Sequence, residues 1–245
     1  MKKIFILVSL TLFLSIHTYA QNDNPKATEV WEPEPKVITP GTTSQDPPSD
    51  AVILFNGKDL SNWVDTKQDP AKWKVENNAM TVEKGTGNIQ TKQAFGSCQL
   101  HVEWRSPAEV MGSSQDRGNS GIFLMGRYEV QVLDSYNNRT YSNGQAGSIY
   151  KQYIPLVNAC RPPGEWQTYD IIFTSPKFGA DSNVVSPARL TVFQNGVLIQ
   201  NNVELKGPTV YIGQPFYKKH NDKESLVLQD HNCLVSYRNI WIREL

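Results

Sequence analysis

The sequence predicts an all-β protein folded as a two-sheet sandwich or jelly roll. Apolar and polar residues alternate with a period of two along several short segments, and a helical period is hard to find after the first twenty residues. The 16 glycines and 15 prolines suit a chain in which many short strands are joined by turns. Strands at roughly regular spacing are typical of a sandwich or jelly roll.

The first twenty residues predict a secretory signal peptide. Lys2 and Lys3 precede an apolar run over residues 4–16, and the small residue Ala20 marks a cleavage site. The run is too short to span a bilayer as a helix. We therefore expect cleavage after Ala20, no membrane span in the mature protein, and a periplasmic or secreted location.

Residues 21–50 are predicted to form a Pro-rich linker. Prolines at this density disfavour strand pairing and favour extended conformations. No later Pro- or Ser-rich break suggests a second domain. Residues 51–245 are therefore expected to fold as one β-sandwich.

Five segments carry the strand pattern most clearly, and one turn joins two strands into a hairpin. Asn195-Gly196 separates two apolar stretches, and both residues tolerate the positive φ angles of a tight hairpin turn. The five segments are residues 100–105, 128–132, 169–173, 189–193 and 237–243.

The overall composition excludes several classes of protein. Lys and Arg total 24, as do Asp and Glu, so the chain lacks the basic excess of a nucleic-acid-binding protein. With 39% hydrophobic and 20% charged residues it does not have the composition of a disordered chain. Aromatic residues make up 10%, a supply of flat side chains for a core or a sugar-binding cleft.

Cys98, Cys160 and Cys233 are too few for a disulfide framework. They form no C-x-x-C pair, so a structural zinc site is not expected. One disulfide with one free thiol and three buried free cysteines both remain open, and we favour the second.

Period-two alternation places some polar side chains on a common face. His101, Glu103 and Arg105 share one side of their strand, and Glu129 and Gln131 share one side of another. Such a face can form a cleft for an extended polar ligand such as a carbohydrate. It can equally be the solvated face that an antiparallel sheet often has.

The pair Glu129 and Gln131 carries a chemical restriction. Retaining sandwich glycosidases place two carboxylates on alternate residues of one strand. Here the second position is an amide, which can act neither as nucleophile nor as general acid. Ordinary two-carboxylate hydrolysis on this strand is therefore disfavoured.

Two further sites are candidates. His231 carries an imidazole, the side chain best suited to proton transfer near neutral pH, although a single histidine beside a strand is more often structural. Asp230 is expected to point to the opposite side, so the two need not form a dyad. Asn119 follows a Gly- and Ser-containing loop and belongs either to a ligand-contacting turn or to a plain one.

Several motifs in order resemble those of the 3-keto-disaccharide hydrolase domain family. They are LFNGKDLSNW (54–63), WKVEN (73–77), NSGI (119–122), RYEVQVLDS (127–135), GEWQTY (164–169), LQDH (228–231) and RNIWI (238–242). The resemblance covers essentially all of residues 51–245. One departure is the stretch 232–237, NCLVSY, where the family usually has a Gly and a Pro after the histidine.

The resemblance implies a concanavalin A-like fold and cleavage of 3-keto-glycosides by elimination and hydration. Such a reaction needs a base at C2, a donor to the C3 oxyanion and an acid for the leaving group, but no carboxylate nucleophile. Glu129 and His231 are expected to be the base and the acid, in either order. The substrate-binding residues are expected to be Asn119, Gln131, Asp134, Trp166 and Arg238. Arg238 could instead be a strand residue paired on the surface.

No cofactor is expected, although a divalent cation held by Glu129, Asp134 and His231 could also serve the oxyanion. The expected partner is a carbohydrate substrate, with a separate sugar 3-oxidoreductase as a source of the ketone. The alternative function is a non-catalytic carbohydrate-binding module on the same sandwich.

Overall fold

The computed structural model describes residues 24–245, so the predicted signal peptide lies outside the described residues. The chain divides into two units, of which the first ends at Val37 and the second is Ile38–Leu245. In the first unit, a short 3-10 helix η1 (Pro25–Thr28) buries none of its residues.

The larger sheet of the second unit has eight antiparallel strands. Its order is β13-β12-β9-β6-β15-β4-β3, with β1 paired to β15. The strands are β1 (Val52–Phe55), β3 (Lys74–Glu76), β4 (Ala79–Thr81), β6 (Cys98–Arg105), β9 (Gln167–Thr174), β12 (Arg189–Gln194), β13 (Val197–Glu204) and β15 (Ser236–Glu244).

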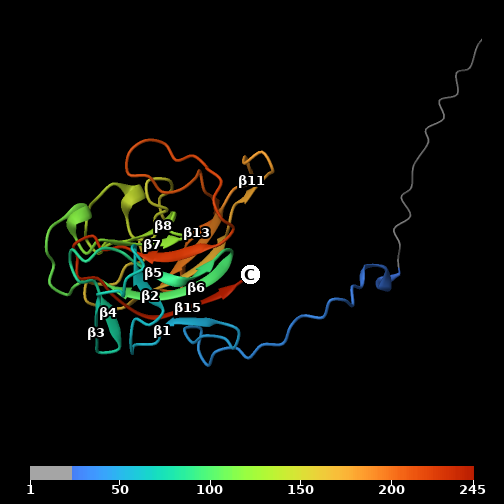
Figure 1. Ribbon diagram of the computed structural model, residues 1–245, viewed down its shortest axis with the longest axis horizontal. Coiled ribbons are helices and arrows are strands. Elements are labelled where there is room, and N and C mark those ends of the chain that lie inside the picture. The colour runs from blue at the N-terminus through green and yellow to red at the C-terminus, as the bar shows by residue number, and fades with distance from the viewer. Residues whose placement is uncertain (1–23) are drawn as a thin grey trace, which may run out of the picture. The chain divides into compact units, whose positions relative to one another are not determined.

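The smaller sheet has five antiparallel strands in the order β2-β5-β14-β7-β8. They are β2 (Trp63–Asp65), β5 (Ile89–Phe95), β7 (Ser120–Leu124), β8 (Tyr128–Val132) and β14 (Glu224–Leu228). A separate hairpin pairs β10 (Lys177–Phe178) with β11 (Val184–Ser186). Figure 1 shows the two large sheets packed face to face, with this hairpin at the edge of the domain.

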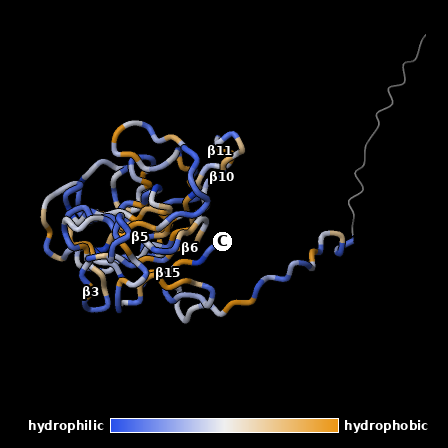
Figure 2. Tube along the Cα trace, in the orientation of Figure 1, coloured by the Kyte–Doolittle hydropathy of each residue, from blue (hydrophilic) through white to orange (hydrophobic). Residues whose placement is uncertain are grey.

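The hydrophobic core lies between the two sheets. Tyr128, Val130 and Val132 on β8 have no exposed surface, and the ring of Tyr128 packs against that of Phe173 on β9 at a centroid distance of 5.5 Å. Hydrophobic residues accordingly follow the strands in Figure 2. The predicted two-sheet, concanavalin A-like sandwich is therefore confirmed.

The hairpin predicted at Asn195-Gly196 joins β12 to β13. Gln194 pairs with Val197, and the two turn residues have φ angles of 53° and 79°. Both angles fall in the left-handed region, which explains why Asn and Gly occupy the turn.

Residues 38–50, within the stretch expected to be a linker, belong to the same unit as the sandwich and contact β15. The backbone oxygen of Gln45 accepts hydrogen bonds from Trp241 Nε1 (2.9 Å) and Asn239 Nδ2 (3.0 Å). Asp50 pairs with Arg243 at 3.0 Å.

The three cysteines are free thiols, and only Cys98 is buried, whereas Cys160 and Cys233 are partly exposed. Across residues 24–245, no helix has the length and apolar character needed to cross a membrane.

Candidate functional site

Strand β8 positions the central residues of the site. Because Tyr128 and Val130 point into the core, the alternate residues Glu129 and Gln131 point out of the other face of the five-stranded sheet. Both are nonetheless buried, since loops cover this face. The predicted common face of Glu129 and Gln131 is thus a covered site rather than a solvated surface.

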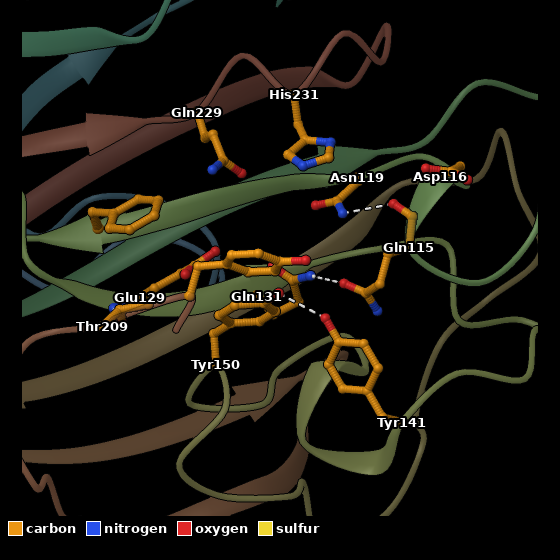
Figure 3. Close-up of a pocket in the computed structure, with 12 residues that line it drawn as sticks. Gln115, Asp116, Asn119, Glu129, Gln131, Tyr141, Tyr150, Thr209, Gln229 and His231 are labelled. Atoms are coloured by element: carbon orange, nitrogen blue, oxygen red, sulfur yellow. Dashed lines mark hydrogen bonds between the residues drawn. The ribbon is translucent and has the colours of Figure 1, made fainter. Parts of the chain in front are cut away.

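These two side chains line a pocket of about 510 Å³, hereafter the central pocket (Figure 3). Its walls come from β7, β8, the 3-10 helix η2 (Ser114–Asp116) and three loops. The lining residues are Gln115, Asp116, Asn119, Phe123, Glu129, Gln131, Tyr141, Tyr150, Thr209, Tyr211, Gln229 and His231.

The carboxyl group of Glu129 lies in an unusually dry environment. The residue is 4% exposed, and burial raises the pKa of its carboxyl from 4.5 to about 8. Its backbone N–H donates to Thr209 Oγ1 at 3.0 Å, which holds the strand against the β13–β14 loop. At neutral pH this side chain is therefore mostly a protonated acid.

Gly121 on the neighbouring strand makes room for this carboxyl group. A Cβ atom at residue 121 would lie 2.6 Å from Glu129 Oε1 and 2.8 Å from Phe123 Cε2. A side chain at residue 121 would therefore displace the Glu129 carboxyl group or the Phe123 ring. The glycine of the Asn119-Ser120-Gly121 motif thus has a steric role in the site.

Gln131 connects Glu129 to a chain of amides. Its Nε2 donates to Gln115 Oε1 at 3.0 Å, and Gln115 Nε2 donates to the backbone oxygen of Gly144 at 2.9 Å. With the Gln131 amide turned by half a rotation, its nitrogen would donate to Glu129 Oε1 (3.0 Å) and to the backbone oxygen of Ser120 (3.1 Å). The Gln131 amide can therefore accept a hydrogen bond from protonated Glu129 or, after the rotation, donate one to its carboxylate.

His231 and Asn119 enter the pocket from the side opposite Glu129 (Figure 3). His231 is exposed on the loop between β14 and β15, whereas Asn119 is buried and donates from Nδ2 to the backbone oxygen of Gln115 at 2.7 Å. Asp230 instead accepts hydrogen bonds from Gly87 N (3.0 Å) and Asn232 N (2.9 Å). The carboxylate of Asp230 is therefore bound to backbone N–H groups, whereas His231 lines the pocket.

Three tyrosines complete the central pocket, and the sequence analysis missed them. Tyr141 and Tyr150 hydrogen-bond to each other through their hydroxyls at 2.6 Å, and Tyr211 comes from the β13–β14 loop. Burial is the main cause that raises the pKa of both Tyr141 and Tyr150. They lie in irregular segments, where strand periodicity gives no information on side-chain direction.

Asp134 does not reach the central pocket. Its Oδ2 accepts from Arg117 Nε at 2.6 Å, and the residue lines a separate pocket of about 300 Å³. The three residues considered as cation ligands, Glu129, Asp134 and His231, are therefore not brought together. Within residues 24–245, no group of three or more His, Cys, Asp or Glu side chains is arranged to hold a metal ion.

Trp166 and Arg238 also lie elsewhere, on the outer face of the eight-stranded sheet. Arg238 Nε donates to Glu103 Oε2 at 2.5 Å, and its guanidinium lies 4.2 Å from the ring centroid of Trp166. Tyr237, next to Arg238, faces the core instead, where its hydroxyl donates to Ser120 Oγ at 2.7 Å. Arg238 is thus a paired strand residue on the surface.

The same outer face contains a buried histidine. His101 is fully buried, its Nδ1 lies 2.6 Å from Asp170 Oδ1, and its ring stacks on Trp241 at 5.4 Å. Burial lowers the pKa of His101, but the hydrogen bonds with Asp170 and Glu103 outweigh it and raise the pKa overall. This polar set stabilises the sheet surface and does not contribute to the central pocket.

A two-sheet sandwich with a pocket of amides, tyrosines and one buried carboxyl group has the features of a carbohydrate-acting protein. Comparison with known proteins defines the class further. The family model described as a 3-keto-alpha-glucoside-1,2-lyase-like domain matches residues 50–243. The chain belongs to this carbohydrate-acting family, as its motifs predicted.

Solved structures agree with this assignment. One is a protein from Parabacteroides distasonis ATCC 8503 that is provisionally named a glycosyl hydrolase. It is 52% identical to this chain, the match covers 90% of this chain and 96% of that chain, and the TM-score is 0.86. A second protein from that organism with the same provisional naming is 20% identical over 80% of this chain and 94% of its own, with a TM-score of 0.57, and supports the fold alone. Among curated proteins, none matches the chain.

Proposed function

We propose that this protein is an exported enzyme that cleaves the glycosidic bond of 3-keto-glycosides by elimination followed by hydration. The family assignment supports a carbohydrate substrate. The central pocket supports the chemistry, because an acid, an imidazole and several amide donors point into one cavity.

The reaction uses the acidity that a C3 ketone gives to the hydrogen on C2. A base removes that proton, and the electron pair moves toward the C3 oxygen to form an enolate. The enolate then expels the C1 oxygen substituent, which takes up a proton and leaves as an alcohol. Water adds to C1 of the resulting enone and restores a 3-keto sugar.

The environment of Glu129 favours one assignment of roles. Because burial raises its pKa to about 8, Glu129 carries a proton at neutral pH and suits the acid that protonates the leaving oxygen. His231, exposed at the opposite wall, is then the base at C2. The amides of Gln131 and Asn119 are the donors for the sugar and the enolate oxygen.

The observation that carries this proposal is the buried carboxyl group of Glu129, whose pKa is raised by burial, beside an amide rather than a second carboxylate. The other carboxylate at the pocket, Asp116, is exposed on η2 at the far side from Glu129 (Figure 3). A binding module would gain nothing from Glu129, because hydroxyl groups can be bound by exposed polar residues without burying an ionisable group. The geometry thus favours an enzyme over a carbohydrate-binding module.

The direct test compares a 3-keto-glucoside with its unoxidised parent and measures the released alcohol. We expect release from the keto compound only, a loss of roughly a hundredfold or more in turnover for both Glu129→Gln and His231→Ala, and exchange of C2 deuterium into water. Cleavage of the unoxidised parent at a comparable rate, or retention of C2 deuterium without a rate effect, would exclude elimination.

Two further parts of the proposal concern the context of the reaction. The ketone must come from a separate sugar 3-oxidoreductase, because the proposed steps contain no oxidation. Export rests on the signal peptide expected at residues 1–20. N-terminal sequencing of the secreted protein should therefore begin at Gln21.

A further inference from the structure

A second cavity adjoins the central pocket behind its tyrosines. This side pocket has a volume of about 390 Å³ and shares Tyr141, Tyr150 and Tyr211 with the central pocket. Beyond the tyrosines it is lined by side chains that include Lys151 and Gln214. A ligand whose reacting ring lies beside Glu129 can therefore extend past the tyrosines into a separate compartment.

The two compartments differ in charge. Asp116 and Glu129 line the central pocket, whereas the side pocket is lined by no Asp or Glu from residues 24–245. Lys151 is the charged residue of the side pocket, and no carboxylate within the described chain pairs with its ammonium group. The side pocket therefore presents an uncompensated positive charge.

The ammonium group of Lys151 is held in a fixed place. Its Nζ donates to the backbone oxygen of Tyr211 at 2.7 Å and lies 4.1 Å from the ring centroid of that tyrosine. The rings of Tyr141 and Tyr150 are 5.8 and 5.9 Å away. The Lys151 backbone N–H donates to Asn143 O at 2.8 Å, with φ at 58°. A lysine held at both ends is pre-organised, so less side-chain entropy is lost when it meets an anion.

The adjoining residue holds the same loop by a different contact. Gln152 donates from Nε2 to the backbone oxygen of Gly207 (3.0 Å) and accepts at Oε1 from Lys206 N (2.8 Å). Gln152 thus fixes the start of the β13–β14 loop at Lys206 and Gly207, through contacts separate from the hydrogen bond between Lys151 and Tyr211. The ammonium group of Lys151 remains available to bind an anion.

We propose that the side pocket receives the leaving group of the glycoside and that Lys151 selects leaving groups that carry an anion, either a carboxylate or a phosphate. This inference rests on the proposed function. The flat tyrosine rings contact the body of the leaving group, and the ammonium group meets its negative charge. Because the ammonium group lies in the side pocket and not beside Glu129, it directs the anion into the side pocket and the molecule into one orientation.

The test uses matched leaving groups on a 3-keto-glucoside: 4-hydroxybenzoate, its neutral isostere 4-hydroxybenzamide, and a phosphate-bearing phenol. The wild-type protein should favour each anionic compound over the amide by roughly fivefold to tenfold in kcat/KM, the scale of one partly exposed charge pair. This preference should shrink at high salt. The carboxylate and phosphate arms show which anion fits better.

Three variants separate charge recognition from loop support. Lys151→Gln should abolish the preference, and Lys151→Arg should retain most of it. Lys206→Gln is the matched control, because its ammonium lies over Tyr153 at 5.2 Å and outside both pockets. If Lys151→Gln lowers kcat/KM equally for anionic and neutral compounds, the lysine only supports the loop and the proposal is wrong. The proposal is equally wrong if a carboxylate on the reacting ring, and not one on the leaving group, shows the dependence on Lys151.

Binding of free 4-hydroxybenzoate distinguishes this proposal from the proposed function. Calorimetry on the wild-type protein needs no turnover, and binding should weaken by roughly fivefold to tenfold in Lys151→Gln but not in Lys206→Gln. Lysine-dependent binding without cleavage of any 3-keto-glucoside would refute the proposed function while leaving the anion site intact. Cleavage of a 3-keto-glucoside without Lys151-dependent binding of 4-hydroxybenzoate would refute the anion site while leaving the proposed function intact.

Discussion

Replacing Glu129 by Gln should lower turnover by roughly a hundredfold or more and at the same time stabilise the protein at alkaline pH. The folded-state pKa of Glu129, about 8, lies above the ordinary value of 4.5, so the folded protein binds a proton that the unfolded chain has released between these pH values. The stability contribution of this proton is complete below pH 4.5 and is lost as the pH rises through about 8. A glutamine at residue 129 is neutral throughout and has no such loss.

The size of the effect follows from the width of this window. At about 1.4 kcal/mol per pH unit, the difference between 4.5 and about 8 corresponds to roughly 5 kcal/mol in the free energy of unfolding. The wild-type protein and Glu129→Gln should therefore have similar stability near pH 4.5. Near pH 8.5 the variant should be more stable by several kcal/mol.

Urea denaturation of both proteins across this pH range measures the difference directly. Other titrating groups are common to both proteins and cancel in the comparison. Glu165→Gln, at an exposed residue, is the matched control and should show no trend with pH. A stability difference between wild type and Glu129→Gln that stays constant from pH 4.5 to 8.5 would refute the reasoning about burial.

Three further substitutions test the site and its surroundings. Gly121→Ala should lower turnover by roughly a hundredfold, because the new Cβ would lie 2.6 Å from Glu129 Oε1. Steady-state kinetics together with a melting curve would separate this loss of turnover from unfolding. Tyr150→Phe should raise KM several-fold with kcat nearly unchanged, because the Tyr150 hydroxyl, which hydrogen-bonds to Tyr141, lies at the pocket wall. A loss confined to kcat would contradict a role in binding. Arg238→Ala should leave activity unchanged but destabilise the fold by about 1–3 kcal/mol, because the buried Glu103 loses its ion pair with Arg238. An activity assay checks the first expectation and thermal unfolding the second.

The fold class could be predicted because period-two alternation reports which face of a strand is buried. β8 has the bounds predicted from residues 128–132. The Asn195-Gly196 turn was found from the φ preferences of its residues and the apolar stretches on either side. The same alternation identified Glu129 and Gln131 as neighbours on one face. Sequence could not show that this face is covered, because the covering loops are distant in the chain.

The candidate site was predicted in part, from the alternation along one strand and from motifs in the adjoining loops. Glu129, Gln131, Asn119 and His231 converge on the central pocket as expected. The other three expected substrate-binding residues do not. Their motifs match the family, but a motif does not report which face of which sheet it joins.

Arg238 illustrates that limit. Tyr237 and Arg238 are adjacent in a strand and therefore point in opposite directions, one into the core and one outward. Since β15 belongs to the sheet opposite β8, an outward residue of β15 lies a full sandwich thickness away from Glu129. Knowing the strand order would have excluded Arg238, but strand order was not available from the alternation pattern.

The amide at Gln131 links the fold to the proposed chemistry. In a site with two carboxylates, the charge of one helps to keep the other protonated. Here burial alone raises the pKa of Glu129, and Gln131 adds no charge. A neutral amide can accept a hydrogen bond from the protonated acid and, after rotation, donate one to the carboxylate that remains when the proton has left. Such a pair can donate a proton and remain hydrogen-bonded afterwards, but it offers no second carboxylate to attack C1. The arrangement therefore suits a substrate that already contains its own electron sink, and a ketone at C3 is such a sink.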